Sequence, residues 1–198
     1  MRTLIDHTRP KSDLWDLTTS QRDRIRQDFR EDSNRLATMI EDRCTGSEEV
    51  VYLGVDGPEL LGSIESNPSL RGQRGYIVIP VAGRHLGQIA GTVQQLVFGD
   101  WFEALNRADV ESAAITGVRA RLVQMANNAG ANPDDGMADA TTGQRYTLDQ
   151  VAHELFAQAW EKNRHRSNAI TGRPAVSDLI TAAISSIRPD AFQAERST

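Results

Sequence analysis

The residues from Tyr76 to Gly91, YIVIPVAGRHLGQIAG, combine an apolar run with closely spaced glycines and one arginine. The apolar run predicts a strand, and the glycines Gly83 and Gly87 after it predict a turn. If a helix follows, the backbone N–H groups at its start favour an anion such as a phosphate, and glycine lets the backbone approach that anion closely. Arg84 adds a positive charge beside them. This stretch is therefore the best candidate in the sequence for a binding site.

Two incompatible geometries fit this stretch. In the first, a helix starts near Gln88, and the N–H groups from Gly83 to Gly87 stay free for a ligand. In the second, Leu86–Thr92 is a strand that pairs with Tyr76–Val81, and the glycines only form the turn between them. The conformation of Leu86–Thr92 therefore decides whether this stretch is a ligand-binding turn or part of an antiparallel meander.

The elements before this stretch would position it. Apolar residues recur at helical spacing from Gln21 to Arg43, which predicts an N-terminal helix, with Thr18, Thr19 and Ser20 as candidates for its cap. Val50–Val55 and Leu60–Glu65 predict the two strands of a hairpin. Tyr76–Val81 is apolar at nearly every position, which predicts a third strand that is central and buried on both faces. Pro80 must then lie at the end of this strand or where no ladder hydrogen bond is needed.

The second half of the chain has mostly helical spacing. Gln88–Arg107 predicts a helix, and so does most of Ala108–Asn128, although a short buried strand also fits residues 113–118. Thr147 is the expected cap of a helix that runs to His165, and Ser177 is the expected cap of a last helix over Asp178–Ile187. We therefore expect long helices after the sheet.

Together these elements predict an α+β fold with an N-terminal helix, a small and mostly antiparallel sheet at about residues 50–92, and a helical C-terminal half. The loop at Asn132–Gln144, NPDDGMADATTGQ, is the strongest loop signal in the chain. We therefore expect an α+β core at residues 1–143 and a helical extension at residues 144–198.

The order of helix, hairpin, strand, glycine-rich loop and helix resembles the core of the GNAT N-acetyltransferase superfamily. In that family a strand that often carries Val-x-Pro leads into an Arg/Gln-x-x-Gly-x-Gly/Ala loop. Val78-Ile79-Pro80 and Arg84-His85-Leu86-Gly87 stand in those places, and Ile89 stands where the family has glycine or alanine. Val118–Ala131 resembles the family's later helix. The resemblance covers roughly residues 20–147.

The resemblance implies an acyl-CoA-dependent N-acyltransferase with acetyl-CoA as its cofactor. The backbone from Val78 to Val81 would bond the pantetheine arm, and the N–H groups of Gly83, Arg84, His85 and Gly87 would hold the pyrophosphate. The family draws its general acid from a tyrosine in the later helix, where this chain has none, so Tyr146 is the candidate acid. Glu65 is the candidate base that would deprotonate an amine.

A non-enzymatic interpretation fits the same residues. The four-stranded meander would resemble the sheet of a GAF or profilin-like sensory module, packed against helices. The protein would then serve in binding or assembly, for instance in a phage or virus. Its helices within residues 148–187 would form the surface for a protein partner or for a second copy in a homo-oligomer.

Composition excludes several other classes of function. The net charge of −5 argues against a nucleic-acid binder, and no apolar run approaches the roughly 18 residues of a membrane span. We expect no metal site, because the four histidines are dispersed and His153-Glu154 lacks a second histidine at Ala157. Cys44 is the only cysteine, so no intrachain disulfide forms, and we expect a cytoplasmic protein.

Overall fold

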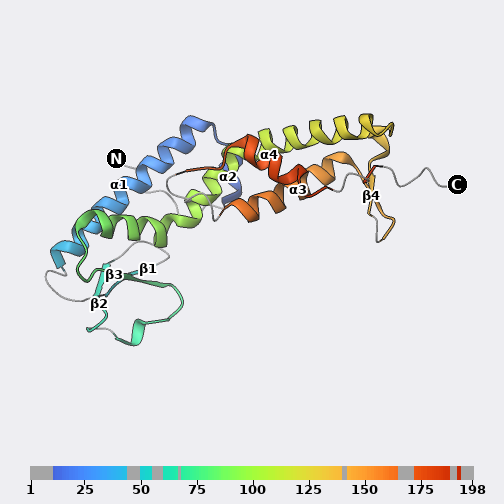
Figure 1. The fold of residues 1–198 in the computed structure, drawn as a ribbon. Helices are drawn as coiled ribbons and strands as arrows, with labels where there is room; N and C mark the ends of the chain where they lie inside the picture. Colours follow the sequence, from blue (N-terminus) through green and yellow to red (C-terminus); the bar gives the residue numbers. More distant parts are fainter. Residues whose placement is uncertain are drawn as a thin grey trace. The chain divides into compact units, whose positions relative to one another are not determined.

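The computed structural model describes residues 11–43, 50–54, 60–66, 68–139, 142–164, 172–187 and 191–192. Cys44, His7 and His165 lie outside these ranges. The fold is α+β, as the sequence predicts (Figure 1). The chain forms two compact units, Met1–Leu105 and Asn106–Thr198. The expected boundary at residue 143 lies within the second unit and stays a prediction.

The first unit begins with a 3-10 helix, η1 (Lys11–Asp16), and the long helix α1 (Thr19–Arg43). The predicted N-terminal helix is confirmed, and Thr18 caps it. The Thr18 side chain accepts a hydrogen bond from the Gln21 N–H, and the Gln21 side chain accepts one from the Thr18 N–H. The buried face of α1 carries Phe29 at its centre, whose ring stacks on that of Phe98 at 4.6 Å between centroids.

The sheet of the first unit consists of β1 (Val50–Gly54), β2 (Leu60–Ser63) and β3 (Tyr76–Pro80), in the order β2-β1-β3 with antiparallel pairs. A short 3-10 helix, η2 (Pro68–Leu70), lies between β2 and β3. The hairpin is confirmed, and Pro80 ends β3, which is one of the two positions expected for it. The prediction of a central position for β3 was wrong, because β1 occupies the centre.

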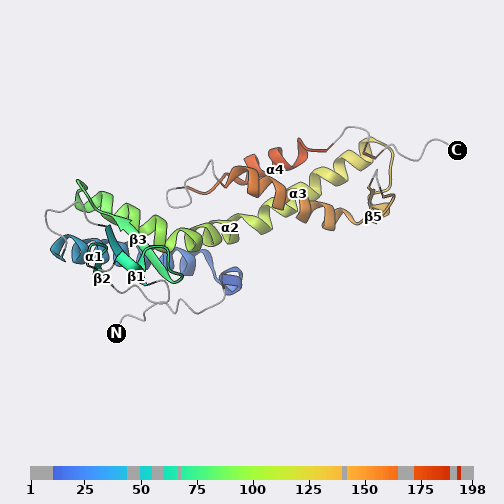
Figure 2. The same ribbon diagram turned by 90° about the horizontal axis from the view of Figure 1, so that it is seen from below.

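The burial pattern of β3 explains why its sequence was misleading. Ile79 is fully buried opposite Val51, and both belong to one apolar cluster with α1 and the start of the next helix. On the other face Val78 is half-buried and Pro80 is exposed. The strand β3, which Figure 2 shows beside α1, therefore packs on one face only, although its sequence is apolar without interruption.

Helix α2 (Leu86–Asn128) contains 43 residues and crosses the boundary between the units. Its start decides between the two geometries. Leu86–Thr92 is helical, so the four-stranded meander is wrong and the sheet ends at Pro80. Residues 113–118 are also helical, which excludes the short strand that fits their composition. Ile89, Ala90 and Val93 occupy one face at helical spacing and pack in the sheet cluster, which favours the helix.

The second unit contains the rest of α2, η3 (Pro133–Asp135), the short pair β4 (Met137–Ala138) and β5 (Arg145–Tyr146), α3 (Leu148–Asn163) and α4 (Val176–Ile184). Thr147 caps α3 in a capping box with Gln150, as predicted. The prediction for Ser177 was wrong, because α4 begins two residues earlier than expected, at Val176, and Ala175 is its N-cap. The earlier start brings Val176 into the helix, where it packs against the cluster that contains Leu179.

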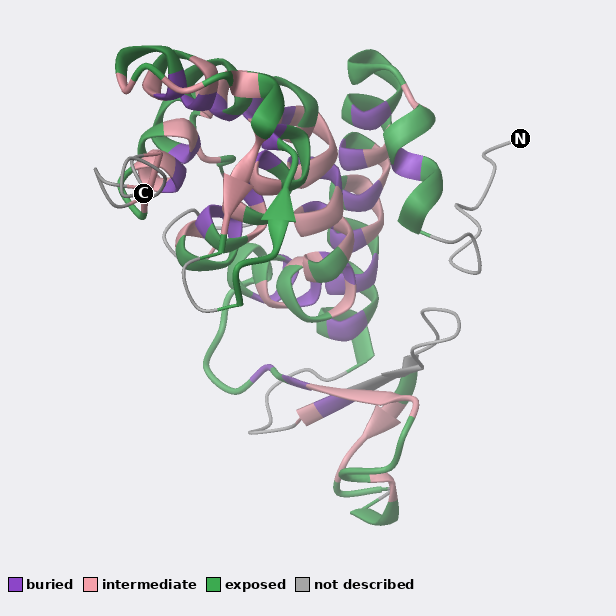
Figure 3. Ribbon diagram, turned by 90° about the vertical axis from the view of Figure 1, so that its right-hand side faces the viewer, coloured by how far each residue is buried: buried purple, intermediate pink, exposed green. Residues whose placement is uncertain are grey.

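Buried residues from three helices form the core of the second unit. The two clusters there contain Val110, Ala114, Val118 and Leu122 of α2, Leu148, Ala152, Phe156, Ala159 and Trp160 of α3, and Leu179 and Ala183 of α4. Buried positions recur along these helices at helical spacing (Figure 3). Among the described residues, no helix is both long enough and apolar enough to cross a membrane.

Candidate functional site

The candidate site is a tight turn between β3 and α2. The Arg84 N–H donates to the Val81 carbonyl at 3.1 Å, which closes a four-residue β-turn. Gly83 occupies the third position with φ of 62°, a conformation that side chains rarely adopt and that a type II turn requires there. A Cβ at Gly83 would meet nothing within 4 Å, so the backbone conformation and not lack of space explains this glycine.

The turn leaves some of its N–H groups available and uses others. The His85 N–H donates to the Gln88 side chain at 3.3 Å, and the Arg84 N–H is used within the turn. In the described part of the chain, the N–H groups of Gly83, Leu86 and Gly87 have no acceptor. Three of the five N–H groups from Gly83 to Gly87 are therefore open, since Leu86 and Gly87 lie in the first turn of α2.

The side chains at the turn bring positive charge to the start of α2. Arg84 is exposed, and its guanidinium donates to the Thr92 hydroxyl at 2.6 Å, which holds it along the first two turns of the helix. The Thr92 hydroxyl in turn donates to the Gln88 carbonyl. His85 is exposed, and its ring lies beside Gly87, 3.5 Å from where a Cβ would stand. The arrangement can hold a small anion next to the helix N-terminus.

Val78 and Val81 have different surroundings. Val81 is 7% exposed and packs in the cluster below the turn, so its side chain anchors the loop. Val78 is half-buried on the opposite face of the sheet. Because β3 pairs only with β1 among the described strands, the backbone of its other edge is available to a ligand.

The two candidate catalytic residues lie in different units. Glu65 is exposed just after β2, and its backbone N–H donates a hydrogen bond to the Ser63 hydroxyl. Tyr146 lies on β5 in the second unit and is 36% exposed. The first unit therefore holds Glu65 together with the turn. Among the described residues, no group of three His, Cys, Asp or Glu side chains could hold a metal ion.

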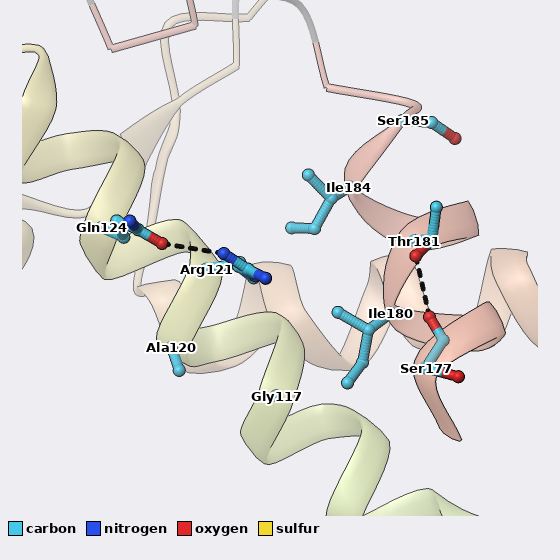
Figure 4. Close-up of a pocket in the computed structure, with 9 residues that line it drawn as sticks. All are labelled: Gly117, Ala120, Arg121, Gln124, Ser177, Ile180, Thr181, Ile184 and Ser185. Carbon is cyan, nitrogen blue, oxygen red and sulfur yellow. Dashed lines mark hydrogen bonds between the residues drawn. The ribbon is translucent and has the colours of Figure 1, made fainter. Parts of the chain in front are cut away.

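Sequence reasoning missed a groove between α2 and α4 in the second unit (Figure 4). Its volume is about 700 Å³. The α2 side supplies Gly117, Ala120, Arg121 and Gln124, and the α4 side supplies Ser177, Ile180, Thr181, Ile184 and Ser185. The spacing of the α4 residues indicates an amphipathic helix, but nothing in the sequence indicates which part of α2 it contacts.

Comparison with models of protein families, with curated proteins and with solved structures finds no significant match for this chain.

Proposed function

We propose that the segment from Val78 to Gly87 binds acetyl-CoA and that the protein is an acyl-CoA-dependent N-acyltransferase. The helical conformation of Leu86–Thr92 is the observation that carries this proposal, since a strand there would leave no helix N-terminus for a phosphate. The open N–H groups of Gly83, Leu86 and Gly87 and the charge of Arg84 support binding of the pyrophosphate. The edge of β3 that pairs with no other described strand supports binding of the pantetheine arm.

In the proposed reaction an amine nitrogen attacks the thioester carbonyl carbon, the C–N bond forms and the C–S bond breaks. Glu65 would accept the proton that the amine loses, because its carboxylate is exposed in the same unit as the turn. The resemblance calls for a general acid that protonates the departing thiolate, and Tyr146, which lies in the second unit, stays the candidate for that role. Both assignments belong to the proposal, as does a cytoplasmic location, where acetyl-CoA is available.

Calorimetry and thermal unfolding with acetyl-CoA test this proposal. We expect measurable heat and a rise in Tm that follows ligand concentration, since a ligand that binds the folded state stabilises it. Arg84→Gln should weaken binding by about tenfold, the loss of one charge-assisted contact. Arg74→Gln, which removes an exposed arginine elsewhere in the same unit, should leave binding unchanged. No heat and no Tm shift at millimolar acetyl-CoA would reject the proposal.

Assembly through residues 148–187 is a second candidate function, for a protein partner or a second copy. It is favoured by the exposed aromatic ring of Tyr146, which lies two residues before α3 and borders this range. Helix α3 exposes His153, Glu154 and Lys162. Tyrosine is enriched at protein interfaces, whereas lysine and glutamate are depleted there, so Tyr146 is the residue that favours this function. Light scattering tests the homo-oligomer: a dimer that Tyr146→Ser dissociates is expected. A monomer at all protein concentrations would reject self-assembly.

A further inference from the structure

The groove between α2 and α4 has an apolar part formed where the helices approach each other. Gly117 and Ala120 present almost no side chain, and Ile180 of α4 reaches the α2 backbone there. Ile180 and Ile184 point from α4 towards α2 in Figure 4. Both are half-buried and pack against the core of the second unit, so each keeps apolar surface in contact with water. That surface fits an aliphatic chain.

The other part of the groove is rich in hydrogen-bond donors. Arg121 donates to the Gln124 side-chain oxygen at 3.0 Å, which leaves the other guanidinium N–H groups and the Gln124 amide N–H groups to donate outward. Two arginines elsewhere on the same helix have a carboxylate partner, Arg107 with Glu111 and Arg119 with Asp149. Arg121 has no carboxylate partner among the residues that the structure describes.

The Thr181 and Ser185 hydroxyl groups of α4 are used within their own helix and do not pair with Arg121. Thr181 donates to the Ser177 carbonyl at 2.8 Å, and Ser185 donates to the Ala182 carbonyl at 2.9 Å, so both hydroxyls turn back to their own helix. The Ser177 hydroxyl, which also lines the groove, donates to the Asp178 carboxylate at 3.4 Å. Among the groove residues that the structure describes, Arg121 and Gln124 therefore supply the remaining side-chain donors. An apolar wall beside a cationic, donor-rich end is complementary to an amphiphilic anion.

We propose that this groove binds an amphiphilic monocarboxylate, with its aliphatic chain along Ile180 and Ile184 and its carboxylate at Arg121 and Gln124. The volume of about 700 Å³ lies within the range of about 300–1,000 Å³ found for small-molecule sites. The site lies within the second unit and is independent of acetyl-CoA binding at the turn of the first unit.

Calorimetric titration of the full chain with decanoate tests the proposal. 1-Decanol, which has the chain without the charge, and acetate, which has the charge without the chain, are the matched ligands. We expect saturable decanoate binding below its micelle concentration, at least about tenfold tighter than either control. Arg121→Gln should weaken decanoate binding by at least about tenfold, since it removes the charged donor. Arg119→Gln, two residues away on the same helix and outside the groove, should change it less than about twofold.

A second variant tests the groove without changing the charge of Arg121. Ser185→Trp adds a large side chain to an exposed position at the groove edge, and it should abolish decanoate binding while circular dichroism shows an unchanged fold. Equal affinity of wild type and Arg121→Gln, equal affinity for decanoate and decanol, or no saturable binding would each overturn the proposal. A dimer in light scattering that Ser185→Trp dissociates would also overturn it and assign the groove to a second copy of the chain.

Discussion

Ile180 of α4 lies directly on Gly117 of α2. A Cβ atom at position 117 would overlap the Ile180 Cδ1 atom and come within 3.0 Å of its Cγ1 atom. A glycine in the middle of a helix costs stability compared with alanine, so its presence there needs a packing reason. The contact supplies that reason, because a Cβ at position 117 would force the Ile180 side chain out of its place against α2.

Gly117→Ala should therefore destabilise the protein, whereas Gly99→Ala should not. A Cβ at Gly99, also in α2, would meet nothing within 4 Å, so Gly99→Ala should stabilise by about 0.5–1 kcal/mol through helix propensity. Gly117→Ala gains the same propensity but overpacks against Ile180. We expect its free energy of unfolding in urea to fall about 1–3 kcal/mol below that of Gly99→Ala. Equal values for the two variants would show that Ile180 moves aside without cost.

The capping box at the start of α3 should be worth about 1 kcal/mol. The Thr147 side chain accepts a hydrogen bond from the Gln150 N–H, and the Gln150 side chain accepts one from the Thr147 N–H. Thr147→Ala leaves the Gln150 donor without that acceptor, so we expect a loss of about 0.5–2 kcal/mol in urea unfolding.

Thr116→Ala makes the same chemical change within a helix and is the control for the capping box. Thr116 is exposed in α2, and its hydroxyl donates to the Ser112 carbonyl. Because alanine has the higher helix propensity, this variant should be neutral or slightly more stable. If both threonine variants lost the same stability, the capping interaction would not be the cause.

The sequence predicted the elements whose signals are local. The helix over Gln21–Arg43, the hairpin around residues 50–65 and the cap at Thr147 are all confirmed, because each depends on residues close together in the chain. The glycine turn after Pro80 was also recognised, since the φ of Gly83 is a local requirement.

Features that depend on contacts between distant residues were predicted less well. Among the described strands β3 pairs only with β1 and therefore lies at the sheet edge, and its own apolar residues do not encode whether a further strand flanks it. Helix α4 has its N-cap at Ala175 and not at Ser177, and Val176 packs against the cluster that contains Leu179, a contact that the local cap signal does not encode. The groove depends on the contact between Gly117 and Ile180, for which the sequence has no pairing signal.

Two arginine–aspartate pairs of the second unit differ in burial, which predicts different contributions to stability. Arg173 bonds Asp109 at 2.7 Å, and the Asp109 side chain is only 1% exposed. Arg119 and Asp149 are 55% and 64% exposed in their side chains. Arg173→Gln should cost about 1–3 kcal/mol, because it weakens the solvation of a buried carboxylate. Arg119→Gln should cost less than about 1 kcal/mol, because water solvates both exposed groups.

Urea unfolding at low and high salt measures this difference. The small contribution of the Arg119 pair should vanish in about 1 M salt, where charges are screened within about 3 Å, whereas the cost of Arg173→Gln should persist. Equal costs for the two variants, or a cost of Arg173→Gln that salt removes, would contradict the role assigned to burial.

Gly83→Ala tests both the backbone strain of the turn and the proposed binding of acetyl-CoA there. Alanine at a φ of 62° should cost about 1–2 kcal/mol of stability without any steric contact, since a Cβ there meets nothing within 4 Å. Gly72→Ala is the matched control, with a φ of 78° and equally open surroundings in the same unit. Both variants should lose similar stability in urea.

If the turn binds acetyl-CoA, only Gly83→Ala should also reduce the heat of its titration, because the strained turn displaces the N–H groups that follow it. Equal heats for both variants would place acetyl-CoA away from the turn, while unequal stabilities without ligand would contradict the strain argument alone.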